Sequence, residues 1–266
     1  MTTSLQVVKP SAYARIKGAW DRRLPADEAR AAWRRISGGS YLSPPSANSK
    51  LAKGQAKGWQ TVSLSLAPAD MSDFHVCPSC TDECRRACIG HTAGNARYPA
   101  VVDARIARTN FLFRHPEAAM GIIAYELERM ATAKRMAVRW NTFSDIVHEA
   151  HNPGMLQYAT DLGYRNYDYT KIAARLLRPF PNYDLTFSYS GYNWSDCKSI
   201  LDSGGRVSMV FAGWFPKKFM GYPVVNGDAH DLRFLDPGSC IVGLKLKGVS
   251  PDTAGQFAVR EGCILE

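Results

Sequence analysis

The chain is long enough to bury a substantial hydrophobic core, and its composition is that of a globular protein. It has 266 residues, of which 45% are hydrophobic and 21% are charged, values typical of one or two folded domains. It shows no charged-then-apolar leader, and no apolar run approaches the roughly 20 residues that a membrane-spanning helix needs. We therefore expect a soluble protein that stays in a reducing cytoplasm and has no membrane partner.

The net charge of +9 is concentrated in the N-terminal part of the chain. Residues 1–58 contain 11 Lys and Arg against 3 Asp and Glu, whereas the remaining residues contain 22 against 21. Residues 11–37 predict two short helices, because apolar residues such as Ala29 and Trp33 recur at helical spacing with arginines on the other faces. Residues 38–58 are rich in Gly, Ser, Pro and Lys and predict a linker or strap.

Two interpretations of this basic segment stay open. The two helices could pack on the body of the protein and turn a solvated basic face outward. Alternatively, the basic face could contact nucleic-acid phosphates. Trp20 and Trp33 do not discriminate, since aromatic residues at helical spacing belong to a core more often than to a base-stacking platform. We therefore predict a basic helical arm and linker over residues 1–58, followed by one domain over residues 59–266.

From Trp59 onward, predicted strands alternate with predicted helices. The first strand covers residues 59–67, where Val, Leu and Leu alternate with small polar residues. Further strands are predicted at 137–142, 164–169, 185–190, 207–212, 222–226 and 241–246. Helices are predicted at 99–114, 116–136, 155–162, 172–177 and 196–201. This alternation indicates a mainly parallel sheet, so we predict an α/β fold, as a complete or partial (β/α) TIM-like barrel. An open doubly wound sheet is the alternative.

Four of the seven cysteines lie within twelve residues in the loop that follows the first predicted strand. They are Cys77, Cys80, Cys84 and Cys88, and we call residues 77–88 the cysteine loop. In a reducing compartment, crowded cysteines are metal ligands more often than disulfides, and the odd total argues against a complete disulfide framework. In parallel α/β folds, ligands gather at the carboxyl ends of the strands. The cysteine loop is therefore expected to form a metal site at that edge.

The spacing of the cysteines constrains the backbone of the loop. A straight helix over residues 77–88 would spread the sulfurs over roughly 16 Å, at about 1.5 Å per residue, which is too far for one ion or cluster. The first part of the loop must therefore turn, as Pro78 favours. Thr81 or Asp82 is then expected to cap a short helix that carries the last two cysteines.

The gaps between the four cysteines favour an iron–sulfur cluster over zinc. The spacing does not fix the number of irons, and we expect a [4Fe-4S] cluster. Structural zinc sites pair two ligands, leave a longer stretch and then pair two more, whereas compact cysteine runs wrap iron–sulfur clusters. Arg85 and Arg86 would offset the negative charge of the thiolates. A third interpretation is that the thiols bind no metal or act only in redox chemistry. Cys80 is either the fourth ligand or a bystander that leaves one iron open to water, substrate or another side chain.

Polar side chains are dense where the later predicted strands end. Asn141 and Asp145 follow the second strand, and Asp168 and Lys171 end the third. The two carboxylates are candidates for acid–base or substrate-binding groups, and Lys171 for the partner of an anion, which together would serve a small-molecule substrate. Capping or turn roles are the alternative for each. Weaker candidates of the same kind are Asp228 and Asp231.

The remaining candidates are histidines and scattered cysteines. His148 and His151 are three residues apart, whereas a zinc-protease motif needs a spacing of four, so we expect surface or turn histidines. His75 and His91 flank the cysteine loop and are candidates to replace a missing fourth ligand. The other cysteines are expected to pack as small apolar groups: Cys197, Cys240 and Cys263.

An ordered set of short motifs resembles the bacteriophage "gene product eighty-eight" domain family. The resemblance implies a phage gene product made in an infected bacterium, and it supplies no reaction. The cysteines shared with the family correspond to Cys77, Cys84 and Cys88, whereas Cys80 goes beyond the pattern. In chain order, the motifs are Asn48-Ser49-Lys50-Leu51, Leu64-Ser65-Leu66, the three cysteines, Arg139-Trp140-Asn141 with Ser144-Asp145, Tyr167-Asp168-Tyr169-Thr170-Lys171, and Gly243-Leu244-Lys245 with Lys247-Gly248.

A looser similarity connects the chain to radical S-adenosylmethionine enzymes. Those enzymes place three cluster cysteines in the loop after the first strand of a partial barrel. Their C-x3-C-x2-C spacing is not present in this sequence, so only the position of the cysteines in the fold is shared.

Two functional hypotheses follow from these observations. In the first, the chain is an iron–sulfur protein, as an enzyme of unknown reaction, with redox or Lewis-acid chemistry at the polar pocket beside the cluster. In the second, it is a nucleic-acid-associated phage factor with a structural or sensory cluster, and residues 1–58 contact phosphates. Under the second hypothesis, removing the arm abolishes salt-dependent binding to nucleic acid.

Overall fold

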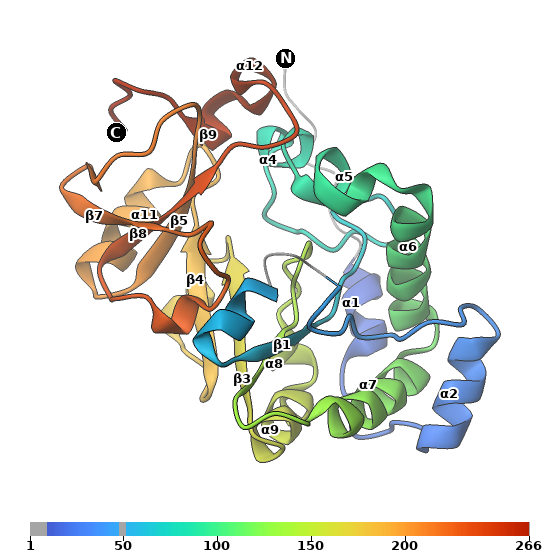
Figure 1. Ribbon diagram of the computed structural model, residues 1–266. Coiled ribbons are helices and arrows are strands. Elements are labelled where there is room, and N and C mark those ends of the chain that lie inside the picture. The colour runs from blue at the N-terminus through green and yellow to red at the C-terminus, as the bar shows by residue number, and fades with distance from the viewer. Residues whose placement is uncertain (1–9, 48–51, 266) are drawn as a thin grey trace.

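The strands of the computed structural model, which describes residues 10–47 and 52–265, form one mostly parallel sheet. The strands follow the order β1-β2-β3-β4-β5-β8-β7-β6, and β9 pairs with β5 (Figure 1). Each pairing is parallel except that of β6 with β7. The strands are β1 (Gln60–Ser63), β2 (Met136–Arg139), β3 (Tyr164–Thr170), β4 (Tyr183–Ser188), β5 (Arg206–Phe211), β6 (Lys218–Phe219), β7 (Tyr222–Asn226), β8 (Cys240–Lys245) and β9 (Ala258–Val259).

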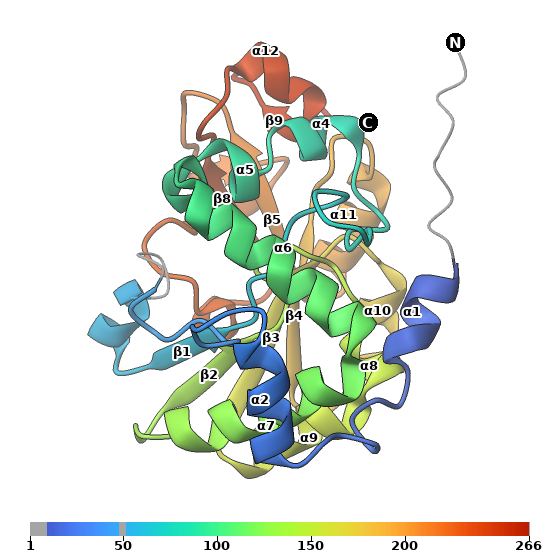
Figure 2. The ribbon, with the colours of Figure 1, turned by 90° about the vertical axis from the view of Figure 1, so that its right-hand side faces the viewer.

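The helices connect these strands and pack on the sheet. Figure 2 shows α2, α6 and α7 on the same side of the sheet, and α11 packs against β4 and β5. None of the helices in the described part of the chain is long and apolar enough to cross a membrane. The α-helices are α1 (Pro10–Ile16), α2 (Ala26–Arg34), α4 (Asp82–Arg86), α5 (Ile89–Thr92), α6 (Pro99–Arg114), α7 (Pro116–Met130), α8 (His148–His151), α9 (Pro153–Asp161), α10 (Ala174–Leu177), α11 (Trp194–Asp202) and α12 (Pro251–Ala254), with short 3-10 turns at Lys53–Lys57, Gly94–Arg97, Arg233–Leu235 and Gly255–Phe257.

The sequence predicted most of these elements. The predicted strand at 222–226 coincides with β7, and the predicted helix at 99–114 coincides with α6. Proline at the first position of both α6 and α7 favours a helix start, because its missing N–H has no partner there in any case. Helix α7 ends six residues earlier than predicted (136 − 130), at Met130, since the chain must turn before β2 begins at Met136.

The sheet is open, so of the predicted complete or partial TIM-like barrel the complete form was wrong, and the structure does not confirm a TIM-like barrel. Within the described residues, no pairing joins β1 to the other end of the sheet. The outer edge of β1 is instead occupied by Ser43, whose N–H donates to the carbonyl of Ser63 at 2.7 Å and whose carbonyl accepts from the N–H of Ser63 at 3.0 Å. The last strand, β9, adds beside β5. The predicted α/β fold with a mostly parallel sheet is confirmed.

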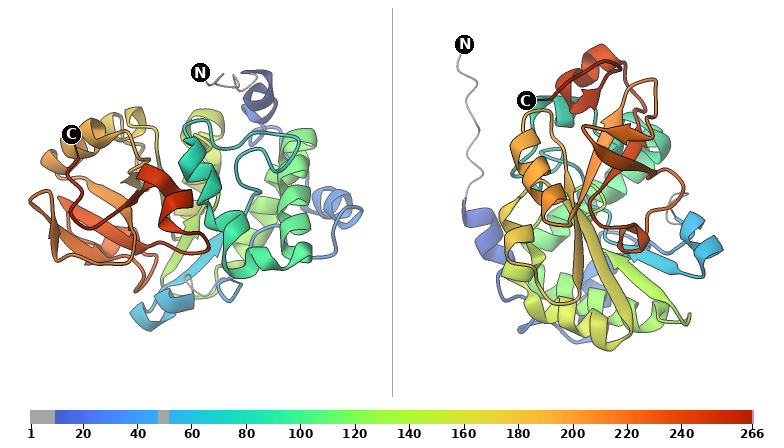
Figure 3. Two further views of the ribbon diagram at one scale, coloured as in Figure 1. Left: turned by 90° about the horizontal axis from the view of Figure 1, so that it is seen from above. Right: turned by 90° about the vertical axis from the view of Figure 1, so that its left-hand side faces the viewer.

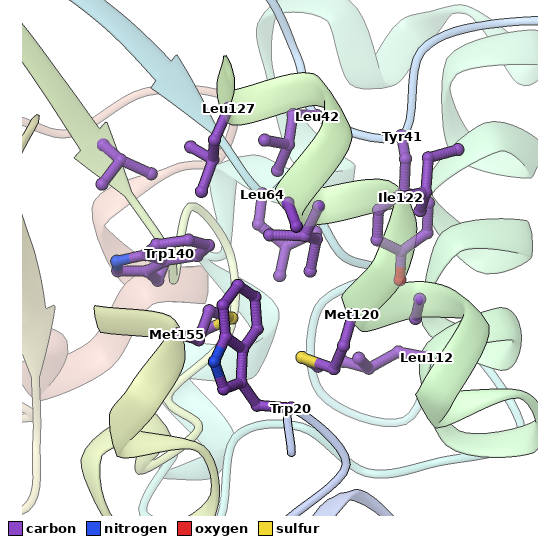
Figure 4. Close-up of a cluster of buried hydrophobic side chains, with 14 of the residues drawn as sticks. Trp20, Tyr41, Leu42, Leu64, Leu112, Met120, Ile122, Leu127, Trp140 and Met155 are labelled. Carbon is purple, nitrogen blue, oxygen red and sulfur yellow. The ribbon is translucent and has the colours of Figure 1, made fainter. Parts of the chain in front are cut away.

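The N-terminal helices share a core with the sheet. Trp20 is buried in the same cluster as Met120 and Trp140 (Figure 4), and Trp33 belongs to that cluster too. Close approach of the N-terminal segment to α7 requires a glycine at position 121, because a Cβ atom there would lie 2.3 Å from the carbonyl oxygen of Leu24. The described part of the basic segment therefore packs on the body, as one of the two interpretations expected. The family motif at residues 48–51 lies outside the described residues.

Candidate functional site

The cysteine loop begins with a turn and continues into a short helix, as its sequence predicted. The N–H of Cys80 donates to the carbonyl of Cys77 at 3.2 Å, which closes the turn around Pro78. Thr81 caps α4, because its Oγ1 accepts from the N–H of Cys84 at 3.1 Å. The prediction that this helix carries both Cys84 and the last cysteine of the loop was wrong. Helix α4 ends at Arg86, because the alanine that follows packs against the C-terminal segment.

The cysteine loop lies at the carboxyl ends of β2, β3 and β4. The thiol of Cys77 donates to the carbonyl of Phe143, after β2, at 3.3 Å. The hydroxyl of Thr81 donates to the carbonyl of Ser190, after β4, at 2.9 Å. On the other side, α12 packs against α4, as Figure 3 shows. The edge of the sheet at which a parallel α/β fold gathers its ligands therefore holds the cysteines.

The four thiols of the cysteine loop are half-buried, and none of them forms a disulfide in the described residues. Burial raises the pKa of Cys88 to about 11, with the charge of Cys84 adding to the shift. Burial also raises the pKa values of Cys77 and Cys80, and neighbouring thiolates of the loop add to both shifts. The sulfurs are therefore close enough to repel as thiolates, and a positive group is needed to hold them deprotonated together.

Lys171 is the cation that these thiols have in common. Burial alone would lower its pKa, yet the thiolate of Cys84, the carboxylate of Asp145 and the other thiolates raise the pKa above its ordinary value. In return, the ammonium group lowers the pKa values of Cys77, Cys80 and Cys88. Lys171 follows the carboxyl end of β3, so the fold rather than local sequence brings it to the cysteine loop.

Two arginines add positive charge at the rim of the loop. Arg85 lowers the pKa of Cys80 and is paired with Asp70 at 2.8 Å. Arg105, on α6, lies over the ring of Phe143 at 4.2 Å, and the thiolate of Cys88 raises its pKa against the effect of burial. Sequence reasoning missed Arg105, since nothing local to α6 connects it to the cysteines. The other predicted cation, Arg86, instead donates to the carbonyl of a C-terminal threonine.

Asp145 connects three parts of the site. Its carboxylate accepts from the hydroxyl of Thr170 at 2.8 Å, from the N–H of Lys171 at 2.8 Å and from Nη1 of Arg175 at 3.0 Å. Its own N–H donates to the carbonyl of Val76, directly before the first cysteine, at 2.8 Å. Arg175 is itself clamped by Glu149 through two bonds, at 2.7 and 2.9 Å. Neither Arg175 nor Glu149 had a sequence signal.

Asn141 and Asp168 are brought together, and their polar atoms bond inside the protein. The N–H of Asn141 donates to Oδ1 of Asp168 at 2.7 Å, and its side-chain amide reaches Oδ2 at 3.3 Å. Burial raises the pKa of Asp168 to about 7, although the hydroxyl of Tyr183 and the charge of Arg139 act to lower it. Oδ1 of Asn141 accepts from the hydroxyl of Ser144 at 2.8 Å. This pair therefore holds the turn that carries Asp145.

The two weaker carboxylate candidates are each paired with a cation, and the partner of Asp231, Arg139, also lies 4.0 Å from Oδ1 of Asp168. Asp231 accepts from Arg139 at 2.7 Å and lies 3.3 Å from the hydroxyl of Tyr167, whose side chain leaves β3 on the face opposite Asp168. Asp228 is bonded to the ammonium group of Lys247 at 2.7 Å.

Predictions for the scattered residues were partly wrong. His148 is buried rather than at the surface, and neither of its ring nitrogens has a hydrogen-bond partner. Cys197 and Cys240 are buried as predicted, whereas Cys263 is exposed because it follows the last strand in the C-terminal segment. Of the two flanking histidines, His75 lies beside the loop, with its Nε2 4.0 Å from the sulfur of Cys80.

The donor atoms that the cysteines of the loop offer are all sulfur, with positively charged side chains around them. Among the described residues, no group of three or more His, Cys, Asp or Glu side chains that could hold a metal ion is found. In a [4Fe-4S] cluster, each thiolate binds a different iron, so the four sulfurs need only surround the cluster. The carboxylates at the loop have other partners: Asp145 is bonded to Arg175, Asp70 to Arg85, and Glu83 to the hydroxyl of Tyr192.

A comparison with known protein families identifies the family of this chain. A family described as Gene product 88 matches residues 42–262, a range that includes the cysteine loop and every strand of the sheet. Comparisons with curated proteins and with solved structures found no match. Because the family match covers most of the chain, and agrees with the ordered motifs of the sequence, the protein belongs to the phage gene product 88 family.

Proposed function

We propose that this protein is an iron–sulfur protein whose cysteine loop holds a [4Fe-4S] cluster. Cys77, Cys84 and Cys88 are ligands in this proposal, and Cys80 is the fourth. One observation carries it: four half-buried thiols lie in one short loop at the carboxyl edge of a parallel sheet, where the charge of Lys171 lowers the pKa values of Cys77, Cys80 and Cys88. The same reading places the protein in a reducing compartment, the cytoplasm of the infected bacterium.

Electrostatics support this assignment. Thiols ligate metals as thiolates, and several thiolates confined together repel one another. Lys171, Arg85 and Arg105 supply positive charge around the loop, and the positive charge of iron would complete the neutralisation. A single zinc ion is less well suited, because tetrahedral zinc requires four ligand atoms within about 2.3 Å of one point.

When bound through all four thiolates, the cluster would supply one-electron transfer, whereas a Lewis-acidic iron would require that Cys80 leave one iron open. The residues of the chain would then bind and orient a small molecule. Lys171 offers an ammonium group to an anionic substrate, and Asp145 fixes the backbone N–H of Lys171. Asn141 and Asp168 act indirectly, since they hold the turn that carries Asp145.

Anaerobic purification of cysteine variants tests the ligand assignment. Cys84→Ala and Cys88→Ala should each lose iron and acid-labile sulfide, and Cys80→Ala should lose less if an exchangeable ligand can replace the fourth thiolate. Cys263→Ala is the matched control, because that thiol is exposed and outside the loop. Full retention of iron in both Cys84→Ala and Cys88→Ala would refute the ligand choice.

We propose nucleic-acid binding as the second candidate function, supported by exposed basic side chains on the N-terminal segment. Arg15, Lys17, Arg34 and Arg35 are all exposed. Because the helices of this segment share the protein core, deleting them would test folding and not binding. Reversing two charges, in Arg34→Glu with Arg35→Glu, is the cleaner change. Salt-dependent binding of DNA or RNA that this variant leaves unchanged would exclude a phosphate-binding role for α2.

A further inference from the structure

Helix α1 of the N-terminal segment is fixed against the body close to the cysteine loop. The N–H of Gly18 donates to the carbonyl of His151 at 2.8 Å. The side-chain amide of Asn152 donates to the carbonyl of Ile16 at 2.9 Å, and its oxygen accepts from the N–H of Trp20 at 3.0 Å. Asn152 is buried, so these bonds are shielded from water and hold the end of α1 in one place.

Tyr13 of this helix reaches the approach to the cysteine loop. Its hydroxyl donates to the carbonyl of His75 at 3.0 Å. Its ring stacks on His151 with centroids 5.4 Å apart, and it meets the edge of Phe113 at 5.9 Å. Burial raises the pKa of Tyr13, and the charges of Cys77, Asp145 and Cys80 add to this shift. The hydroxyl is therefore a protonated donor that lies near the first two thiols.

The residues bonded to Tyr13 lead directly into the first cysteine. Phe74 stacks on Phe113, the same ring that Tyr13 contacts, with centroids 4.7 Å apart. Val76 donates its N–H to the carbonyl of Ala69 at 2.9 Å. The imidazole of His75 lies 4.0 Å from the sulfur of Cys80. The backbone before Cys77 is thus held from α1, from α6 and from the loop after β1.

We propose that Tyr13 is a positioning residue of the cysteine site: it fixes the turn that carries Cys77 and Cys80. The N-terminal segment is then part of the cofactor site as well as a basic surface. The inference rests on the proposed function, because Cys77 and Cys80 are cluster ligands in that proposal. The positioning itself is a property of the chain and can be measured without metal.

Site-resolved alkylation of the metal-free full-length chain tests the proposal. Tyr13→Phe keeps the ring and removes only the hydroxyl. We expect iodoacetamide to modify Cys77 and Cys80 roughly fivefold faster in this variant, the factor that loss of one neutral hydrogen bond corresponds to. The exposed Cys263 serves as the internal reference, and its rate should not change.

Tyr164→Phe is the matched control. Tyr164 is a buried tyrosine whose hydroxyl also donates to a backbone carbonyl, that of Leu127 at 2.8 Å, at the amino end of β3. Equal rates at Cys77 and Cys80 in Tyr13→Phe and the unchanged protein would overturn the proposal. So would an equal acceleration in Tyr13→Phe and Tyr164→Phe, because that result indicates general loosening.

A readout on the metal-loaded protein separates this inference from the proposed function. Tyr13→Phe should release iron to a chelator several-fold faster than Tyr164→Phe, with an altered EPR spectrum. If the unchanged protein holds no iron while the alkylation rates still respond to Tyr13→Phe, the cluster is wrong and the positioning role stands. If iron is present and neither alkylation nor release responds, the cluster stands and the role of Tyr13 is wrong.

Discussion

The backbone N–H of Lys171 donates to the Oδ2 atom of Asp145 at 2.8 Å, and this bond locks the loop after β3 to the loop after β2. The N–H of Asp145 in turn donates to the carbonyl of Val76, which precedes the first cysteine. One carboxylate thus fixes the backbone of Lys171, whose charge lowers the pKa values of three of the thiols. The geometry of the cysteine site depends on residues from three separate loops.

Loss of the Asp145 carboxylate should strongly destabilise the protein. Asp145→Asn leaves the buried guanidinium of Arg175 without one of its two carboxylate partners, and breaking such a buried pair costs about 3 kcal/mol. Urea denaturation measures the change. Asp202→Asn is the control, because Asp202 forms an exposed pair with Lys198, and exposed pairs contribute little to stability. Equal costs in the two variants would contradict the role assigned to Asp145.

Removal of the Lys171 charge should disfavour the reduced cluster. Lys171→Met keeps an unbranched side chain of similar length but leaves the thiolates without their common cation. Negative charge at the site then becomes more costly, so the midpoint potential should shift to more negative values. Redox titration followed by EPR measures the shift. Lys198→Met, on the exposed face of α11, should leave the potential unchanged. An unshifted potential in Lys171→Met would place the ammonium group too far from the cluster to matter.

Acid should destabilise the fold through His148. Burial lowers the pKa of this imidazole to about 3, and the charges of Arg175 and His151 add to the effect. The folded state therefore resists protonation below the ordinary pKa of about 6.5, while the unfolded state accepts the proton. Stability is full above that pH and falls as the pH drops from 6.5 toward 3.

The loss should be roughly 1 kcal/mol at about pH 5.5, since one pKa unit corresponds to about 1.36 kcal/mol. Replacing His148 with Leu should remove this part of the pH dependence, as measured by urea denaturation of the metal-free chain between about pH 7.5 and pH 5.5. An unchanged slope in His148→Leu would show that other groups carry the acid sensitivity.

Gly121→Ala should separate the N-terminal segment from α7. The new methyl group would lie 2.3 Å from the carbonyl oxygen of Leu24, a backbone atom that cannot move without shifting the chain. Overpacking of this kind costs about 1–3 kcal/mol. Thermal unfolding measures the effect, and Gly39→Ala is the control, because its nearest neighbouring atom is 3.9 Å away. A neutral Gly121→Ala would mean that the packing of this segment is looser than the structure shows.

Local sequence signals predicted the elements well, because strand alternation and helix-starting prolines act over a few residues. The strand at 222–226 and the turn at Pro78 follow from such signals. The closure of the sheet could not be predicted this way. Whether β1 pairs with a distant strand or with Ser43 depends on contacts between segments that are far apart in the chain. The sequence pattern of a strand does not indicate which segment it pairs with.

In the candidate site, too, local sequence signals predicted some features, whereas contacts between separated segments could not be predicted. Proximity in sequence was enough to group the four cysteines and to identify Thr81 as a cap. Lys171 and Asp145 were identified because parallel strands bring their carboxyl ends together. Arg105 and Tyr13 were not, since each reaches the loop from the side of a helix whose own pattern indicates only packing.

Iron and acid-labile sulfide analysis of the anaerobically purified protein, together with Mössbauer spectroscopy, tests the central claim most directly. We predict about four iron and about four sulfide per chain, with the spectrum of a [4Fe-4S] cluster. Stoichiometric zinc without sulfide, or a protein that binds neither metal after reconstitution with iron and sulfide, would contradict the assignment of the cysteine loop as a cluster site.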